Sequence, residues 1–164
     1  MLEINLVTKQ EAGAISLLAK PIWEEHYIPI IGSAQVEYML EKFQSESAIQ
    51  EQIEQGYQYY LVIQDEQPVG YFSVQPRSNT LFLSKFYLDQ STRGKGFGRQ
   101  MLTFVESLAR QSAANKIELT VNKFNPAYEA YLKMGFENIE AIQIDIGNGY
   151  IMDDYRMNKI ISPE

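Results

Sequence analysis

The sequence predicts an α/β domain in which helices flank a mixed, mainly antiparallel sheet. Its 164 residues are 45% hydrophobic and 21% charged, which suits a single domain over residues 1–164 and excludes disordered and fibrous classes. The first half shows mainly helical spacing of apolar residues, and no repeat or linker-like run divides the chain. An antiparallel meander then leads into alternating strands and helices, an order typical of a mixed sheet covered by helices.

Three helices are expected in the first half, because apolar residues recur there at helical spacing between residues that start or stop helices. The second helix carries a stripe that we assign to the core: Val36, Met39, Leu40 and Phe43. The first helix spans residues 12–22 after a Thr8 cap, and Pro21 ends it or opens a new turn. The second spans residues 33–44 after Gly32 and a Ser33 cap. The third spans residues 47–55 and stops at Gly56, which is expected to be left-handed.

Strands dominate the remainder, since β-branched and aromatic residues gather there in short runs between turn residues. Two helices interrupt them, one after a glycine-rich loop and one over residues 125–134 that ends at Gly135. The closing hairpin turns at Gly147-Asn148-Gly149, residues that tolerate positive φ. The expected strands are residues 59–63, 69–74, 81–88, 116–121, 142–146 and 150–152.

The charge balance and the lack of cysteine narrow the function. Fourteen basic and twenty-one acidic residues give a net charge of −7, which argues against nucleic acid as a partner and suits a cationic small molecule or a basic peptide. Without cysteine there is no disulfide framework, no thiolate nucleophile and no thiolate metal site. The single His26 leaves no cluster of ligands, so no metal is expected.

A soluble cytoplasmic protein without membrane association is expected. The N-terminal residues Met1-Leu2-Glu3-Ile4-Asn5 show neither the basic region nor the apolar run of a signal peptide. The apolar stretches of the chain fall far short of the roughly 20 residues that cross a bilayer.

The segment that carries chemistry is Arg93-Gly94-Lys95-Gly96-Phe97-Gly98-Arg99, between an expected strand and an expected helix. Glycines let backbone N–H groups turn toward an anion, and the helix that follows offers unpaired N–H groups and the positive end of its dipole. Three basic side chains add charge. A flexible turn with solvated charges is the alternative interpretation.

Neither of the common nucleotide motifs fits this loop. A dinucleotide fingerprint that starts at Gly94 would need its third glycine where Arg99 stands, and Gly98 comes one residue early. A P-loop motif is absent from the chain. Binding of ATP or NAD is therefore not favoured.

The flanking residues resemble the GNAT superfamily of N-acetyltransferases over roughly residues 58–159. Arg-x-x-Gly-x-Gly at Arg93, Gly96 and Gly98, after Phe86-Tyr87-Leu88, is similar to the acetyl-coenzyme A (acetyl-CoA) signature of that family. The block from Val121 to Phe136, with Tyr-x-x-x-Gly-Phe at its end, resembles the downstream family motif. The closing hairpin and residues 152–157 also resemble bacterial members near the PaiA-type polyamine acetyltransferases.

The resemblance implies a GNAT-like sheet that splays between its central strands and binds acetyl-CoA as cosubstrate. Backbone groups of Phe86, Tyr87 and Leu88 would bind the pantetheine arm and polarise the thioester carbonyl. The loop would hold the pyrophosphate through Arg93, Gly94, Lys95, Gly96, Phe97, Gly98 and Arg99. The acceptor amine would then attack the acetyl group directly.

The downstream motif implies a catalytic role for Tyr131, which matches the family tyrosine that protonates the leaving thiolate. Packing in the core is the alternative for this side chain. Tyr128, one turn earlier, would line the cofactor site. The common family pattern places an Asn seven residues before the Tyr, whereas Asn125 is six before Tyr131, so either Asn122 or Asn125 would contact the cofactor. Asn125 could also cap the helix ahead of Pro126.

The general base stays open at this stage. Glu24, Glu25 and His26 form a polar cluster in the presumed acceptor region, and a structural role for His26 is the favoured alternative. Asp145, Asp153 and Asp154 could attract a cationic acceptor or simply be solvated.

The leading hypothesis is an acetyl-CoA-dependent N-acetyltransferase for a primary amine of a small molecule, a polyamine or a peptide. The competing one is a non-catalytic acetyl-CoA-binding sensor or scaffold. A homodimer is compatible with the resemblance, although no residue pattern demonstrates one.

Overall fold

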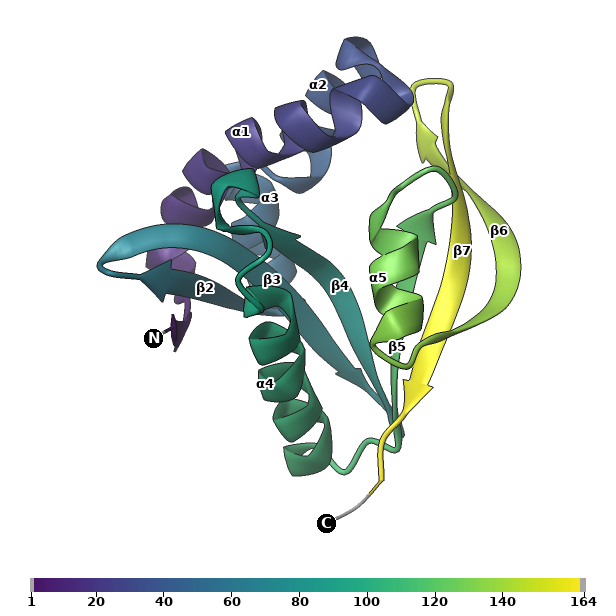
Figure 1. Ribbon diagram of the computed structural model, residues 1–164. Helices are drawn as coiled ribbons and strands as arrows, with labels where there is room; N and C mark the ends of the chain where they lie inside the picture. Colours follow the sequence, from purple (N-terminus) through teal and green to yellow (C-terminus); the bar gives the residue numbers. More distant parts are fainter. Residues whose placement is uncertain (1, 163–164) are drawn as a thin grey trace. The chain divides into compact units, whose positions relative to one another are not determined.

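The computed structural model describes residues 2–162, which contain five α-helices, two short 3₁₀ helices and seven strands (Figure 1). These residues divide into two compact units. The first unit comprises residues 2–75 and 84–101, and the second comprises residues 76–83 and 102–162. The prediction of one domain over residues 1–164 stays a prediction. Among residues 2–162 no helix combines the length and hydrophobicity that crossing a bilayer requires.

The seven strands form one sheet in the order β1-β2-β3-β4-β5-β7-β6, which confirms the mixed α/β class. The pairs β1–β2, β2–β3, β5–β7 and β7–β6 are antiparallel, whereas β4 and β5 are parallel. The β4–β5 register joins Thr80–Phe82 to Lys116–Glu118, the first three residues of each strand. The strands are β1 (Leu2–Leu6), β2 (Gln58–Gln64), β3 (Gln67–Arg77), β4 (Thr80–Leu88), β5 (Lys116–Asn122), β6 (Glu137–Gly147) and β7 (Tyr150–Ile160).

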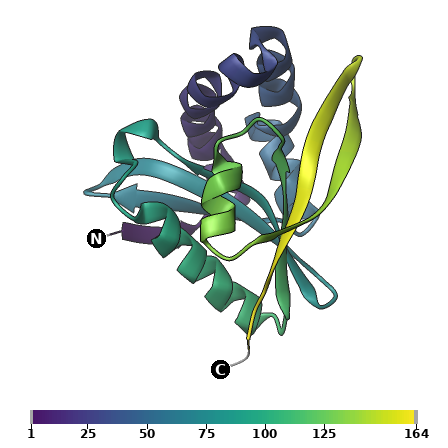
Figure 2. The same ribbon diagram turned by 45° about the vertical axis from the view of Figure 1, so that its right-hand side comes forward.

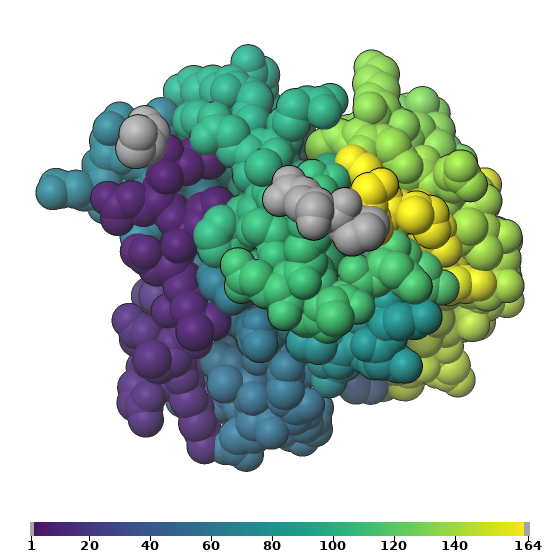
Figure 3. Space-filling model, turned by 90° about the horizontal axis from the view of Figure 1, so that it is seen from below, coloured from purple at the N-terminus to yellow at the C-terminus, as the bar shows by residue number. Residues whose placement is uncertain are grey.

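Strand β1 was not expected from the sequence. It pairs antiparallel with β2 at the edge of the sheet, and Val7 continues the pairing through its N–H to the Tyr59 carbonyl over 2.8 Å. Glu3, Asn5 and Leu6 are exposed, and this segment, purple in Figure 3, lies at the surface. A five-residue edge strand with so few buried side chains gives little of the alternation on which a sequence-based assignment rests.

Helix α1 (Ala12–Ile31) runs through Pro21 and Pro29, so the expectation that Pro21 ends it or opens a new turn is wrong. A proline removes one helical hydrogen bond, but burial of an apolar stripe on both sides of it keeps the helix in place. Thr8 starts the short helix η1 (Lys9–Glu11), where its N–H donates to Glu11 over 2.9 Å. The buried residues of α1 are Ala12, Ile15, Ala19, Ile22, Trp23 and Tyr27.

Helices α2 (Ser33–Phe43) and α3 (Glu46–Glu54) confirm the next two predicted helices within a few residues. Gly32, with φ of +85°, occupies the cap position of α2, so the proposed Ser33 cap is wrong and Ser33 is the first helical residue. Ser45 caps α3 by accepting the Ala48 N–H over 3.3 Å.

The ends of α2 and α3 lie within one residue of the predicted ends, whereas α1 continues nine residues beyond its predicted end. Gly56 takes the left-handed conformation after α3 as expected, with φ of +101°. Of the predicted apolar stripe of α2, Val36 and Met39 are buried, whereas Leu40 and Phe43 are half-buried.

The second unit ends in a hairpin, β6–β7, that is much longer than predicted (Figure 2). Its turn holds Gly147, Asn148 and Gly149 at positive φ, as the sequence indicated. The predicted strands, residues 142–146 and 150–152, cover only the ends next to the turn, because β6 is exposed over most of its length and shows little alternation.

One face of β5 and β7 packs against helices α4 (Phe97–Gln111) and α5 (Ala127–Lys133). Lys159 donates to the Met134 carbonyl at the end of α5 over 2.7 Å and pairs with Glu106 of α4 at 2.8 Å. Tyr128 of α5 stacks on Tyr155 with ring centroids 5.1 Å apart. The buried side chains of the second unit include Leu102, Val105, Ala109, Ile117, Leu119, Val121 and Met157.

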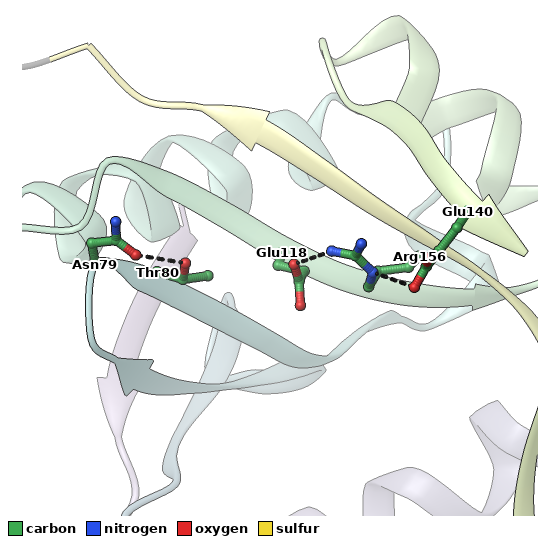
Figure 4. Close-up of polar contacts among 5 residues, drawn as sticks. All are labelled: Asn79, Thr80, Glu118, Glu140 and Arg156. Carbon is green, nitrogen blue, oxygen red and sulfur yellow. Dashed lines mark hydrogen bonds and ion pairs between the residues drawn. The ribbon is translucent and has the colours of Figure 1, made fainter. Parts of the chain in front are cut away.

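The other face of β5 and β7 is polar. Arg156 lies between Glu118 and Glu140, at 2.7 Å and 3.0 Å, and Figure 4 shows this chain of charges beside Thr80. Because side chains alternate along a strand, Thr120 and Asp154 share this polar face with Arg156.

A buried lysine joins the helices of the first unit to its strands. The Lys85 ammonium on β4 donates to the Phe43 carbonyl at the end of α2 over 2.7 Å and to Gln52 Oε1 on α3 over 3.0 Å. It also bonds the Tyr59 hydroxyl of β2. The cation therefore satisfies a carbonyl at the negative end of α2. Burial nevertheless lowers the pKa of Lys85 to about 7.

We expect Lys85 to make stability depend on pH. Between pH 7 and pH 10.5 the unfolded chain binds more protons than the folded chain, because burial lowers the folded pKa, so stability rises with pH across this window. Lys85→Met should remove that rise and lower the free energy of unfolding by ~1–3 kcal/mol at the alkaline end, where polar partners lose their donor. Urea unfolding of both proteins across the window measures this. If the free energies of unfolding of the wild type and of Lys85→Met changed with pH in the same way, the assigned role of Lys85 would be contradicted.

Candidate active site

The glycine loop of the first unit starts from a rigid anchor. At the end of β4 the Asp89 N–H donates to the Val69 carbonyl over 2.7 Å. The Asp89 carboxylate then accepts the Ser91 N–H over 2.9 Å and caps the short helix η2 (Gln90–Thr92). Thr92 is buried, and its hydroxyl donates to the Asp89 carbonyl over 2.7 Å. Thr92, the residue before Arg93, is therefore fixed by burial and by its hydrogen bond to Asp89.

The loop itself needs glycine for its backbone conformation. Gly94 and Gly96 have φ of +80° and +77°, a region that side-chain-bearing residues rarely adopt. A Cβ at either position would meet nothing within 4 Å, so the requirement is conformational rather than steric. Space therefore remains open around this turn.

Helix α4 begins at Phe97, directly after the turn. The Gln100 N–H donates to the Gly96 carbonyl over 3.2 Å, so Phe97 and Gly98 lie in the first turn of the helix, where N–H groups point outward along the helix axis. Arg93, Lys95 and Arg99 are exposed around them. The N–H groups of the first turn, the positive helix end and three cations form an arrangement that suits a diphosphate.

Helix α1 contacts this loop within the first unit. Nη2 of Arg93 lies 3.4 Å from Nδ1 of His26, and the His26 ring packs edge-on against Tyr27 at 4.8 Å. The structure therefore brings His26 to the glycine loop. The sequence had placed His26 only in the presumed acceptor region.

An aromatic cluster surrounds Tyr87 at the end of β4. The rings of Trp23, Tyr71 and Tyr87 lie 5.3–5.5 Å apart in successive contacts, and the Tyr27 hydroxyl donates to the Tyr87 hydroxyl over 3.4 Å. Trp23 Nε1 donates to the buried Tyr71 hydroxyl over 3.1 Å, and burial raises the pKa of Tyr71. Sequence reasoning missed this cluster because its members come from α1, β3 and β4.

The two candidate asparagines of the second unit both bind backbone. Asn122 Oδ1 accepts the Phe124 N–H over 2.8 Å, and Asn125 Oδ1 accepts the Ala127 N–H over 2.9 Å at the start of α5. Asn125 therefore holds the turn just before α5, although the cap position itself is occupied by Pro126 and not by Asn125. A cofactor contact of either residue stays a prediction.

The two candidate tyrosines lie on α5. Tyr131 is buried and packs edge-on against Phe136 with centroids 5.5 Å apart. Tyr128 is half-buried, and its hydroxyl accepts from Asn138 Nδ2 over 3.3 Å. Core packing of Tyr131 is thus observed, and its catalytic role stays a prediction.

The three candidate aspartates differ sharply in environment. Asp145 is exposed and accepts the Gly147 N–H over 2.8 Å in the hairpin turn. Asp153 lies 2.9 Å from the Lys123 ammonium. Asp154 is only 1% exposed, its Oδ1 has no hydrogen-bond partner, and the Thr120 side chain bonds its carboxyl group. Burial, followed by the Asp153 charge, raises the pKa of Asp154 to about 6.

Comparison with known proteins identifies the family. The family model of the acetyltransferase (GNAT) domain matches residues 28–158, which is most of the chain. The chain belongs to the GNAT acetyltransferase family. It is therefore an acyltransferase whose cosubstrate is acetyl-CoA, as the resemblance of the glycine loop and the downstream motif implied.

Solved structures share the GNAT fold over nearly the whole length. The PaiA N-acetyltransferase from Thermoplasma acidophilum, in complex with coenzyme A, is 18% identical with a TM-score of 0.81, covering 98% of this chain and 99% of that one. A GCN5-related N-acetyltransferase from Rhodopseudomonas palustris is 16% identical with a TM-score of 0.81, covering 96% and 94%. The ribosomal-protein-S18-alanine N-acetyltransferase from Escherichia coli is 16% identical with a TM-score of 0.71, covering 100% and 96%. None of the curated proteins matches the sequence.

We expect Gly70→Ala to disturb the end of β4 in this GNAT protein. A Cβ at Gly70 would lie 2.5 Å from the Tyr87 carbonyl oxygen and 2.9 Å from a Leu88 methyl group, so the backbone of β4 would have to shift. The free energy of unfolding should fall by about 1–3 kcal/mol, the typical cost of overpacking. Chemical denaturation measures the loss. Wild-type stability of this variant would show that β4 has more room than these contacts allow.

Proposed function

We propose that this GNAT protein transfers an acetyl group from acetyl-CoA directly to a primary amine of a small molecule, a polyamine or a peptide. The observation that carries the proposal is the turn before α4, where two glycines at positive φ leave open space beside the first helical turn. A diphosphate is the group that such a turn recognises best.

In this proposal the segment from Phe86 to Arg99 provides the cofactor contacts. Arg93, Lys95 and Arg99 neutralise the pyrophosphate, while backbone N–H groups from Gly94 to Gly98 bind its oxygens. Phe86, Tyr87 and Leu88 offer main-chain groups to the pantetheine arm, and an N–H aimed at the thioester carbonyl stabilises the charge that develops during attack. The aromatic cluster and the Gly70 contact support this role by holding the end of β4 in place.

The residues of the second unit complete the proposal. Tyr131 donates its phenolic proton to the departing thiolate, and Tyr128 lines the cofactor site. Asn122 and Asn125 shape the turn between β5 and α5 and are the candidates for a polar contact with the cofactor. The hydrogen bond that Asn122 accepts from the backbone engages only its oxygen, and its side-chain NH₂ group is of a kind that can donate to a cofactor oxygen.

The acceptor class follows from charge and from the relatives. The net charge of −7 favours a cationic amine through long-range attraction. The similar structures include enzymes named for a ribosomal-protein alanine and for aminoglycosides, so the fold alone does not select between small-molecule and peptide amines. A thiol-release assay with acetyl-CoA across polyamines, amino acids, aminoglycosides and peptides tests the proposal. If none of the amines in the panel raises the release of CoA above background, direct transfer to such an acceptor is contradicted.

Gly96→Glu should weaken coenzyme A binding about 10- to 100-fold, the equivalent of the ~1.5–3 kcal/mol that a hydrogen bond to a charged group contributes. The new carboxylate would occupy the turn and repel the pyrophosphate. Gly149→Glu is the matched control, because Gly149 has φ of +79° and open space but lies in the β6–β7 turn. Isothermal titration calorimetry measures both affinities. Equal losses in the two variants would attribute the effect to backbone strain alone.

Tyr131→Phe should lower kcat by about 10²–10⁴-fold, the usual contribution of general acid catalysis, because the thiolate then leaves unprotonated. The affinity for acetyl-CoA should change little, since the ring and its packing on Phe136 are kept. Tyr128→Phe, on the same helix, removes a hydroxyl that binds Asn138 and should leave kcat near the wild-type value. Steady-state kinetics distinguish them. Unchanged turnover in Tyr131→Phe would refute its role as the acid.

A further inference from the structure

An amine acceptor must lose a proton before it can attack a thioester, because a primary alkylamine is protonated at neutral pH. The general base was left open by the sequence. In the first unit, Nδ1 of His26 lies 3.4 Å from the Arg93 guanidinium, so His26 contacts the glycine loop. The second unit holds a buried carboxylate that the proposed function does not yet use.

Asp154 lies beside the segment that carries the proposed cofactor residues. In the β5–β7 register it is directly opposite Asn122, the last residue of β5. Directly opposed residues of an antiparallel pair project to the same face, and Thr120 lies on that face two residues before Asn122. The carboxyl group and the Thr120 side chain are hydrogen-bonded, and Thr120 is more exposed than the buried Asp154.

The hydrogen-bonding capacity of the Asp154 carboxyl group is only partly satisfied within the described residues. Its Oδ1 has no hydrogen-bond partner, which is costly for a side chain that is 1% exposed. The Oδ1 of the neighbouring Asp153 also has no hydrogen-bond partner, but it lies 2.9 Å from the Lys123 ammonium, which compensates its charge. An unpaired oxygen on a buried carboxylate is an acceptor that is available for a proton.

We propose, on the basis of the proposed function, that Asp154 takes up the proton that the acceptor amine loses, with the Thr120 hydroxyl passing the proton between them. A hydroxyl is suited to this step, because it donates its own proton to the carboxylate while its lone pair receives one from the ammonium. Asp154 then acts through Thr120 as the proton acceptor of the transfer. Its site of action is the polar face of β5 at the level of Asn122.

The proton balance of the reaction closes with these residues. The acceptor enters as an ammonium and leaves as an amide, so it gives up two protons while a C–N bond forms and the C–S bond of the thioester breaks. The first proton passes through Thr120 to Asp154 and frees the nitrogen lone pair. The second leaves the nitrogen after attack and replaces the proton that Tyr131 gives to the thiolate. Asp154 finally returns its proton to solvent.

The faces of β5 separate the two proton transfers. Helix α5, which carries Tyr131, contacts the face of β5 and β7 on which Tyr155 lies. Asp154 precedes Tyr155 in β7 and therefore projects to the opposite face. The proton acceptor and the proton donor thus belong to different sides of one strand, which keeps the acid from protonating the base directly.

The charged groups around Asp154 suit a base that works near neutral pH. Burial and the Asp153 charge raise its pKa, while the Thr120 hydrogen bond and the Lys123 charge lower it, with a result of about 6. A base with a pKa near 6 is ionised at neutral pH and still accepts a proton readily. The groups that act on its charge are thus Asp153, Thr120 and Lys123. Arg156 lies on the same face of β7, in its ion pairs with Glu118 and Glu140.

The first experiment needs no cosubstrate. Carbon-13 NMR of the ligand-free protein should show a carboxyl group that titrates near pH 6 and is absent from Asp154→Asn. Thr120→Val should move this titration to higher pH, because it removes a hydrogen bond that lowers the pKa, and Thr120→Ser should restore the wild-type value. Titration of Asp154 near pH 3.8, or no effect of Thr120→Val, would overturn the proposal.

The second experiment compares pH profiles of kcat/KM for the best amine of the panel. The wild type should lose activity below about pH 6, and Asp154→Asn should lower kcat/KM about 10²–10⁴-fold and abolish this acidic limb. Thr120→Val should also lower kcat/KM, because the hydroxyl that passes the proton is lost, and it should shift the acidic limb of the remaining activity to higher pH; Thr120→Ser should do neither. Asp145→Asn, an exposed carboxylate of the same hairpin, is the matched control and should follow the wild type. Coenzyme A affinity and melting temperature are measured for every variant, since a purely structural role would change these and leave the limb in place.

The outcomes separate the two proposals. A wild-type protein that releases thiol, together with an Asp154→Asn variant of unchanged pH profile, would overturn the role of Asp154 and leave the proposed function intact. A wild-type protein that releases no thiol with any amine would overturn the proposed function and the role of Asp154 with it. Should Asp154→Asn not fold, the shift of the acidic limb in Thr120→Val and its reversal in Thr120→Ser decide the question.

Discussion

The exposed N-terminus of α4 is the constraint from which the rest of the proposed chemistry follows. A protein with a net charge of −7 repels a polyanion at long range, so attraction has to come from groups in direct contact with it. The N–H groups of the first turn of α4 and the cations Arg93, Lys95 and Arg99 provide that contact. Glycine at 94 and 96 is required because the turn only exists at positive φ. The binding of a phosphate-bearing cosubstrate is thus confined to one short segment.

The remainder of the first unit fixes where this segment lies. The Asp89 N–H bonds β3, Thr92 is buried, and the Tyr87 ring is enclosed by aromatic side chains from α1 and β3. Such ordering is completed during folding, so little further conformational entropy is lost when a ligand binds. Rigid placement also matters for the chemistry, because an N–H group stabilises a developing oxyanion only when it is aimed in advance.

The sequence predicted the parts of the molecule that local patterns determine. The glycine loop, α3, the central strands and the Gly147–Gly149 turn were found because spacing, aromatic or β-branched runs and positive-φ residues are visible within a few positions. Family resemblance of the loop and of the Tyr131 block added the GNAT fold. Burial overrode local rules at Pro21, where the apolar stripe of α1 continues, and β1 is an edge strand with little alternation. Long-range contacts were out of reach, so the sequence showed neither the Lys85 cluster nor the pairing of Thr120 with Asp154.

The two buried ionisable residues illustrate why burial alone does not indicate function. Lys85 donates to a carbonyl, an amide oxygen and a hydroxyl, so each of its three protons has a partner and the residue is explained by the stability of the first unit. Asp154 has one oxygen without a hydrogen-bond partner, and the Thr120 hydrogen bond and the Lys123 charge compensate its burial only in part, since its pKa is still raised to about 6. Folding alone would favour a smaller or fully bonded side chain there. A proton delivered through Thr120 is a partner whose chemistry fits the remaining oxygen.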